Sequence, residues 1–137
     1  MKKLIPFALV WLVMASSCQK LIDKKKEQIV LDIMTSGEWY VEQYFEGSAN
    51  ITSDFLNYLF RFKEDRTVTG TRGAEVYDGT WAEDVSNISI TSDFPTAPDP
   101  VKKLNGTWKI KDSSRDYVKA EMTTPTGKNI LRLRKKE

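Results

Sequence analysis

Hydrophobic and polar positions alternate along most of the chain after residue 36. β-Branched and aromatic residues alternate with polar ones, and turn-forming residues interrupt the pattern at short intervals. A period of two is typical of half-buried β-strands. The pattern therefore predicts eight strands, at residues 38–46, 55–63, 66–72, 75–83, 86–92, 104–112, 116–124 and 128–135.

Residues 19–36 follow a longer period, with charged side chains between the apolar ones. Apolar residues near helical spacing are Leu21, Ile22, Ile29, Val30, Ile33 and Met34. This spacing predicts a tether followed by one amphipathic helix. Asp23 is the expected N-cap, and Gly37 is the expected stop.

The lengths of the links between strands differ at the two ends of the predicted sheet. In an up-and-down arrangement, alternate links lie at opposite ends. The links at 64–65, 84–85 and 113–115 share one end and are all tight, whereas both long links, 47–54 and 93–103, share the other end with 73–74 and 125–127. We therefore expect an all-β, eight-stranded antiparallel up-and-down barrel with one N-terminal helix, a closed floor and one mouth, with a sandwich as the alternative.

The first 17 residues have the pattern of a secretory signal peptide. Lys2 and Lys3 precede an apolar run at 4–14, and the small residues 15–17 follow it. The run is shorter than the roughly 20 apolar residues that a transmembrane helix needs. We expect residues 1–17 to be removed, leaving a tether and helix at 18–36 and a barrel at 37–137.

The single cysteine, Cys18, follows this segment in the stretch "ASSC". The stretch resembles the lipobox of bacterial lipoproteins. The resemblance implies that the Cys18 sulfur receives a diacylglycerol and that cleavage falls just before it. Some lipoproteins are retained in the inner membrane by an aspartate after the cysteine, but this chain has Gln19 there. The resemblance therefore implies that the protein is anchored in the outer membrane of a Gram-negative cell. The alternative is an ordinary signal peptide with an incidental cysteine.

Charge excludes one class of partner. The chain has 21 Lys and Arg against 19 Asp and Glu, and without Lys2 and Lys3 both counts are 19. A nucleic-acid partner requires a basic excess, so none is expected. No second cysteine is present to form a disulfide, so the hydrophobic core must hold the domain together. The sequence leaves the oligomeric state open.

The residue types argue against catalysis. The chain has no histidine, which removes the commonest general base and the commonest neutral metal ligand. Ser86, Ser89 and Ser113 therefore have no imidazole to activate them. Carboxylates at 64–65 and 83–84 lie beside turns, where capping is their usual role. We expect no enzymatic activity, no cofactor and no metal.

Three short stretches resemble the lipocalin family, in its compact bacterial lipoprotein form. They are "GEW" at 37–39, "RDYVKA" at 115–120 and "LRLRK" at 131–135, although Arg115 stands where lipocalins carry threonine. The resemblance implies a structural floor where an arginine packs over Trp39. We expect a guanidinium within roughly 6 Å of the Trp39 ring, from Arg134 as first choice and Arg132 as second. A fatty-acid-binding-protein-like barrel remains the alternative.

The predicted barrel interior is the candidate ligand site. An eight-stranded barrel is only just wide enough for its own side chains, so a filled interior and a cavity both remain open. Alternation places Trp39, Val41, Gln43 and Phe45 on one face of the first strand, and Ile88 with Ile90 on one face of the fifth. The expected lining and mouth residues are Tyr58, Phe60, Trp108 and Met122, with Phe55, Phe94 and Pro95 at the mouth.

The sequence thus favours a membrane-anchored lipoprotein whose barrel binds a small hydrophobic or amphipathic ligand. The alternative is a non-enzymatic module that contacts a protein or glycan through the links at 47–54 and 93–103, over a solid barrel. A cavity above roughly 300 Å³ favours the first function, and an exposed apolar patch on the loops favours the second.

Overall fold

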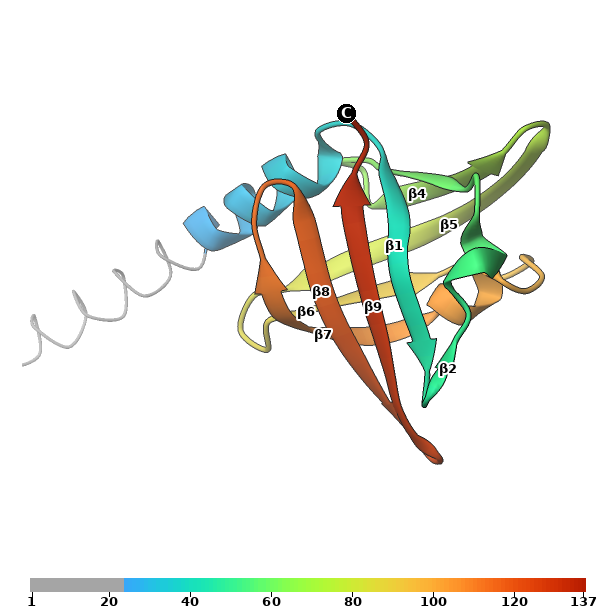
Figure 1. Ribbon diagram of the computed structural model, residues 1–137. Coiled ribbons are helices and arrows are strands. Elements are labelled where there is room, and N and C mark those ends of the chain that lie inside the picture. Colours follow the sequence, from blue (N-terminus) through green and yellow to red (C-terminus); the bar gives the residue numbers. More distant parts are fainter. Residues whose placement is uncertain (1–23) are drawn as a thin grey trace, which may run out of the picture.

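The computed structural model describes residues 24–137 as an antiparallel barrel with a helix across one end (Figure 1). The helix covers residues 24–35 of this part of the chain. The strands are β1 Trp39–Glu46, β2 Ala49–Asn50, β3 Leu59–Phe62, β4 Thr67–Arg72, β5 Glu75–Asp84, β6 Ser89–Asp93, β7 Gly106–Ser113, β8 Tyr117–Thr124 and β9 Gly127–Lys135. Two short 3-10 turns, η1 Thr52–Phe55 and η2 Val101–Leu104, lie in the long links.

The sheet closes on itself, which confirms the predicted eight-stranded barrel. Each strand from β3 to β8 pairs with the strand that follows it in the chain. The barrel closes because β1 pairs with both β3 and β9. The short β2 pairs only with β1. The two seams of β1 are unequal: β1 pairs with β9 from Trp39↔Lys135 to Glu46↔Asn129, but with β3 only through Trp39↔Phe60.

Two predicted strands are longer in the sequence pattern than in the structure. The strand expected at 55–63 is confined to β3, because Asn57 has a φ of 70° and residues 52–55 form η1. The strand expected at 86–92 begins only at Ser89, because Ile88 has a φ of 51° and lies in the preceding turn. A positive φ cannot be accommodated in a regular strand.

A bulge in β1 overturns the predicted inward face of that strand. The register with β9 shifts between Val41 and Gln43. The extra residue reverses the alternation, so that Tyr44 is buried while Gln43 and Phe45 are only half-buried. The placement of Trp39 and Val41 on the inner face holds, but that of Gln43 and Phe45 is wrong.

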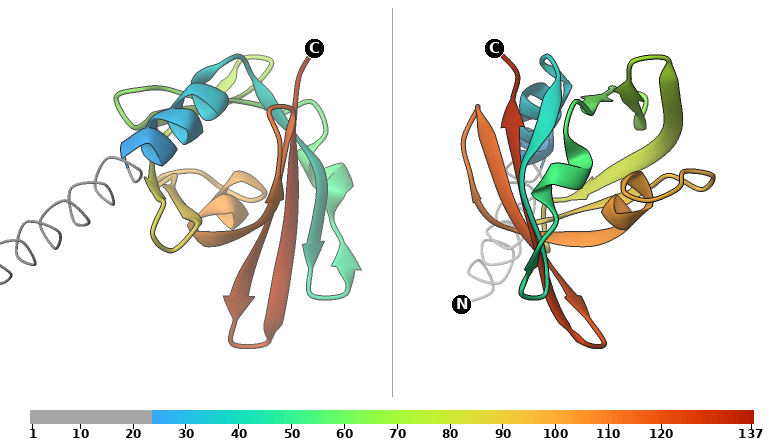
Figure 2. Two further views of the ribbon diagram at one scale, coloured as in Figure 1. Left: turned by 90° about the vertical axis from the view of Figure 1, so that its left-hand side faces the viewer. Right: turned by 45° about the vertical axis from the view of Figure 1, so that its right-hand side comes forward.

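The two ends of the barrel differ as the link lengths predicted. At the end called here the loop end, the Tyr44 hydroxyl donates to the Lys103 carbonyl at 2.7 Å, and the Tyr44 ring stacks on Phe55 at 5.2 Å. Lys103 also pairs with Glu46 at 3.1 Å. Both long links therefore lie together. The opposite, helix end carries the helix and the tight β5–β6 and β7–β8 turns (Figures 1 and 2).

Candidate ligand-binding groove

The barrel interior is filled by its own side chains. The cavity that remains inside has a volume of about 50 Å³, whereas pockets for small ligands measure roughly 300–1,000 Å³. It is lined by Met34, Phe60, Phe62, Ile90, Ser92, Phe94, Leu104, Trp108, Ile110, Val118, Ala120, Leu131 and Leu133. A space of this size holds at most a few water molecules, so the interior of the described barrel has no room for a ligand.

Three of the seven predicted lining and mouth residues reach this small cavity. Phe60, Trp108 and Phe94 line it, whereas Tyr58, Met122 and Phe55 do not. The reason is mutual packing of the aromatic rings. Phe55 stacks on Tyr44, and Tyr58 stacks on Phe60 at 6.2 Å while its hydroxyl donates to Glu75 at 3.2 Å. Met122 is partly buried against the core, and Pro95 is exposed.

The long 93–105 link folds inward and closes the predicted mouth. Phe94 and Val101 are at most 2% exposed. The Asn105 side chain accepts from the Phe94 amide at 2.6 Å and donates to its carbonyl at 3.3 Å. The Leu104 carbonyl accepts from the Trp108 indole at 3.0 Å. The link is therefore held by hydrogen bonds that are part-buried between Phe94 and Asn105 and buried between Trp108 and Leu104.

Tyr44 holds this link to β1. Its side chain is fully buried, and its hydroxyl also accepts from the Asn129 amide at 3.4 Å. Burial raises the pKa of Tyr44 to about 12, so the hydroxyl stays protonated and donates to the Lys103 carbonyl. The bulge that turns Tyr44 inward thus contributes directly to closing the loop end.

The cation over Trp39 is a lysine, not the expected arginine. Lys135 Nζ lies 4.8 Å from the Trp39 ring centroid and donates to the Ile33 carbonyl at 3.0 Å. The Trp39 indole donates to the Met34 carbonyl at 3.0 Å. Alternation explains the replacement: Leu133 points inward, so Lys135 shares the face of Trp39. These contacts fix the C-terminal end of the helix to the barrel.

Arg132 and Arg134 lie on the outer face of β9, where the lipocalin resemblance did not place them. Their guanidinium carbons lie 4.5 and 5.7 Å from the Tyr117 ring centroid. Both pair with the bulge residue Glu42. Hydrogen bonding to Arg134 is the main cause that holds the pKa of Glu42 below its usual value. The two arginines therefore clamp the outside of the β1–β9–β8 seam.

A groove of about 620 Å³ separates the helix from the helix end of the barrel. The helix contributes Lys26, Ile29, Val30, Ile33 and Met34. Their spacing of three and four residues places them on one face of the helix. The barrel side of the groove is formed by Val85, Ser86, Ile88, Ser89, Ile90, Ile110, Ser113, Ser114 and Val118, together with Glu83 and Asp84.

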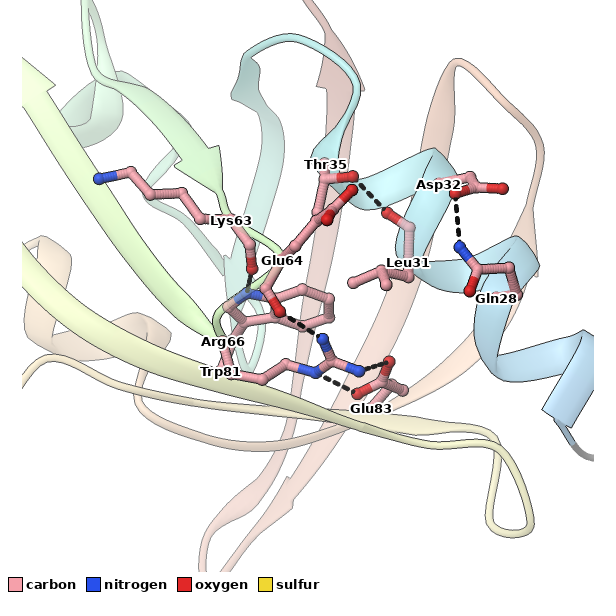
Figure 3. Close-up of polar contacts among 9 residues, drawn as sticks. All are labelled: Gln28, Leu31, Asp32, Thr35, Lys63, Glu64, Arg66, Trp81 and Glu83. Carbon is pink, nitrogen blue, oxygen red and sulfur yellow. Dashed lines mark hydrogen bonds and ion pairs between the residues drawn. The ribbon is translucent and has the colours of Figure 1, made fainter.

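Both carboxylates of the groove are already engaged. Glu83, whose side chain is 7% exposed, accepts from Arg66 at 2.9 and 2.8 Å (Figure 3). Arg66 also lies 5.3 Å from the Trp81 ring centroid. Asp84 accepts from the backbone and side chain of Asn87, and the side-chain bond chiefly lowers the pKa of Asp84. The other polar lining residues are Lys26, which is exposed, and Ser86, Ser89, Ser113 and Ser114, of which Ser89 is buried.

The sequence contained a signal for this groove that strand prediction overlooked. Ile29 and Ile88 are 57% and 60% exposed. Ile88 was predicted to face the barrel interior, but it lies in the β5–β6 turn and faces the groove. A large aliphatic residue within a turn is unusual, because turns favour small and polar residues.

Within residues 24–137, no cluster of three or more potential ligand side chains is arranged to hold a metal ion. The helix in this part of the chain is too short and too polar to cross a bilayer.

Comparison with known proteins identifies the fold. No protein-family model matches this sequence, and no curated protein matches it. The structure is similar to the crystal structure of a DUF4847 family protein from Bacteroides vulgatus, with a TM-score of 0.58 and 18% sequence identity. The match covers 79% of this chain and 99% of that one. The chain is therefore a closed eight-stranded barrel with a fold that also occurs in a Bacteroides protein.

Proposed function

We propose that this chain is a lipid-anchored binding protein that holds a small amphipathic molecule in the groove at its helix end. The observation that carries this proposal is the contrast between the two spaces. The groove measures about 620 Å³ and the barrel interior about 50 Å³, and only the first has the size of a ligand pocket. The site therefore lies outside the barrel, not within it as the sequence predicted.

The position of the groove supports delivery of the ligand from a membrane. Cys18 lies outside the described residues, and we propose that it carries the lipid anchor. The six Cα–Cα steps from Cys18 to Lys24 span at most about 20 Å. The groove lies beside the helix that follows this tether, so it is near the bilayer when the chain is anchored. The proposed location is the outer membrane of a Gram-negative cell.

Binding, not catalysis, fits the chemistry of the groove. Its carboxylates are engaged by Arg66 and Asn87, and the chain contains no histidine to act as a general base at neutral pH. What the groove offers is aliphatic surface together with the ammonium of Lys26 and several serine hydroxyls. That combination suits a molecule with an apolar body and a polar end.

The test measures binding of a fluorescent fatty acid to the expected mature chain, residues 18–137, carrying Cys18→Ala, which lacks both the apolar run at 4–14 and the proposed site of lipid attachment. Ile88→Glu places a negative charge in the groove, where it repels the carboxylate of the fatty acid, without disturbing the core, because Ile88 is 60% exposed. We expect it to weaken binding about tenfold. Val76→Glu is the matched control, since Val76 is 57% exposed and lies away from the groove. Absence of binding, or equal effects of the two variants, would contradict the proposal.

A second candidate function is recognition of a protein or glycan by the loop end. The filled interior favours it, and Leu56, which is 68% exposed, is the large apolar side chain that a partner would contact. Native mass spectrometry of the protein purified from its own organism separates the two functions. A bound small molecule supports groove binding, and a bound macromolecule that is lost in Leu56→Asp supports the loop end.

A further inference from the structure

The lining of the groove indicates the chemistry of its ligand. Nine of the lining side chains are aliphatic or methionine: Ile29, Val30, Ile33, Met34, Val85, Ile88, Ile90, Ile110 and Val118. Among the described residues, no aromatic side chain lines it. Such a surface offers burial of alkyl groups but no ring face for stacking. An alkyl chain fits this lining better than a flat aromatic ring does.

The helix gives the groove a closed and an open end. At the closed end, Trp39 and Lys135 bond to the carbonyls of Met34 and Ile33. At the open end, Lys26 is exposed. The axial distance from Lys26 to Met34 is about 12 Å at the α-helical rise. A ligand in the groove therefore has a polar end near Lys26 and an apolar end toward Met34.

Met34 lies between the groove and the barrel interior. Four residues line both spaces: Met34, Ile90, Ile110 and Val118. Met34 is 2% exposed and is the one helix residue that reaches the interior cavity among those described. Its side chain occupies the place where the two spaces meet.

We infer that the groove takes a single unbranched alkyl chain, as in a fatty acid, and that Met34 is the stop against which the end of the chain rests. This inference rests on the proposed function. Met34 thus determines the longest chain that is fully buried. Beyond that length, additional methylenes remain in water or at the open end and add no affinity.

The test measures Kd for decanoate, dodecanoate, tetradecanoate and hexadecanoate with the same mature chain, residues 18–137, carrying Cys18→Ala. Each buried methylene is expected to tighten binding about fourfold, until the affinity reaches a plateau. Met34→Ala joins the groove to the interior cavity. At the first two-carbon extension that no longer increases the affinity of the parent protein, we expect the affinity of this variant to increase about tenfold.

Met122→Ala is the control, because Met122 is partly buried in the barrel but lines neither space. It should leave the chain-length profile unchanged. Ile90→Val is the second variant, since Ile90 is half-buried, lines both spaces and loses only one methylene. If Met34→Ala does not fold, Ile90→Val is used in its place, and it should extend the chain-length profile by a smaller step. If the folded variants keep the parent profile, Met34 is not the stop, although the groove still binds. If no fatty acid binds the parent protein, the proposed function itself fails.

Discussion

Replacement of Tyr44 by phenylalanine tests whether the loop end is held closed. The substitution keeps the buried ring, which stacks on Phe55 and meets Trp108 edge-on at 5.7 Å. It removes only the hydroxyl. That hydroxyl joins three parts of the chain, because it donates to the Lys103 carbonyl at 2.7 Å and accepts from Asn129 at 3.4 Å.

The expected loss follows from the groups left behind. Asn129 is 8% exposed, so water cannot easily replace the missing partner. Leaving buried polar groups without a partner costs about 1–3 kcal/mol. For a chain of this size, that loss corresponds to a fall in Tm of about 4–12 °C.

Thermal unfolding followed by circular dichroism measures this loss. Tyr117→Phe is the control, since the Tyr117 hydroxyl donates to Asp112 at 2.8 Å on the exposed surface. Water can solvate that carboxylate, so the control should change stability by less than about 0.5 kcal/mol. Equal and small effects of the two substitutions would refute the view that Tyr44 fixes the inward fold of the 93–105 link.

Three further predictions concern the seam, the interior and the anchor. The hydrogen bond to Arg134 is the chief cause that lowers the pKa of Glu42 in the folded protein. The ionised Glu42 carboxylate therefore stabilises the fold fully above its ordinary pKa of 4.5, and this stabilisation is lost as the pH falls through the lower pKa of the folded state. Glu42→Gln should therefore lower stability at neutral pH by about 0.5–1 kcal/mol and flatten the acid-side fall in Tm; an unchanged pH profile would contradict this. In Gly70→Ala, the new Cβ would lie 2.8 Å from a Phe60 ring carbon. Because the interior is filled, we expect the free energy of unfolding measured in urea to fall by about 1–3 kcal/mol. An unchanged free energy of unfolding would show that the interior has space beside Phe60. Labelled palmitate should be incorporated into the wild type but not into Cys18→Ala, and equal labelling of both would rule out the proposed anchor.

The alternating pattern was sufficient to predict the barrel but not the inner face of every strand. In "WYVEQYFE" at 39–46, apolar residues occupy both alternations. Because of the bulge at Glu42, Tyr44 faces the barrel interior, and Gln43 and Phe45 do not. A bulge depends on pairing with a distant strand, here β9, and the local sequence carries no signal for it.

The closure of the mouth was also beyond the sequence pattern. The length of the link expected at 93–103 predicted an open mouth at this end of the barrel. The link instead contains η2 and buries Phe94, Val101 and Leu104. Whether a long loop folds inward depends on the space left by the strands that surround it, and that space is a tertiary property.

The groove was predictable only in part. Helical spacing placed Ile29, Val30, Ile33 and Met34 on the apolar face of the helix, and the helix is present. The surface opposite that face comes from the β5–β6 and β7–β8 turns, which are more than 50 residues further along the chain. Because no single element contains the groove, periodicity within one element could not predict it. The exposed Ile88 is the residue whose sequence context signalled it.

The most direct test of the account is a methyl NMR titration of the mature chain, residues 18–137 with Cys18→Ala, with dodecanoate. The account predicts that the methyl resonances of Ile29, Ile33 and Ile88, which line the groove, shift as the ligand is added. Those of Leu56 and Val101 at the loop end should not move. Shifts confined to the loop end, or spread through the barrel interior without the groove isoleucines, would contradict a binding site between the helix and the barrel.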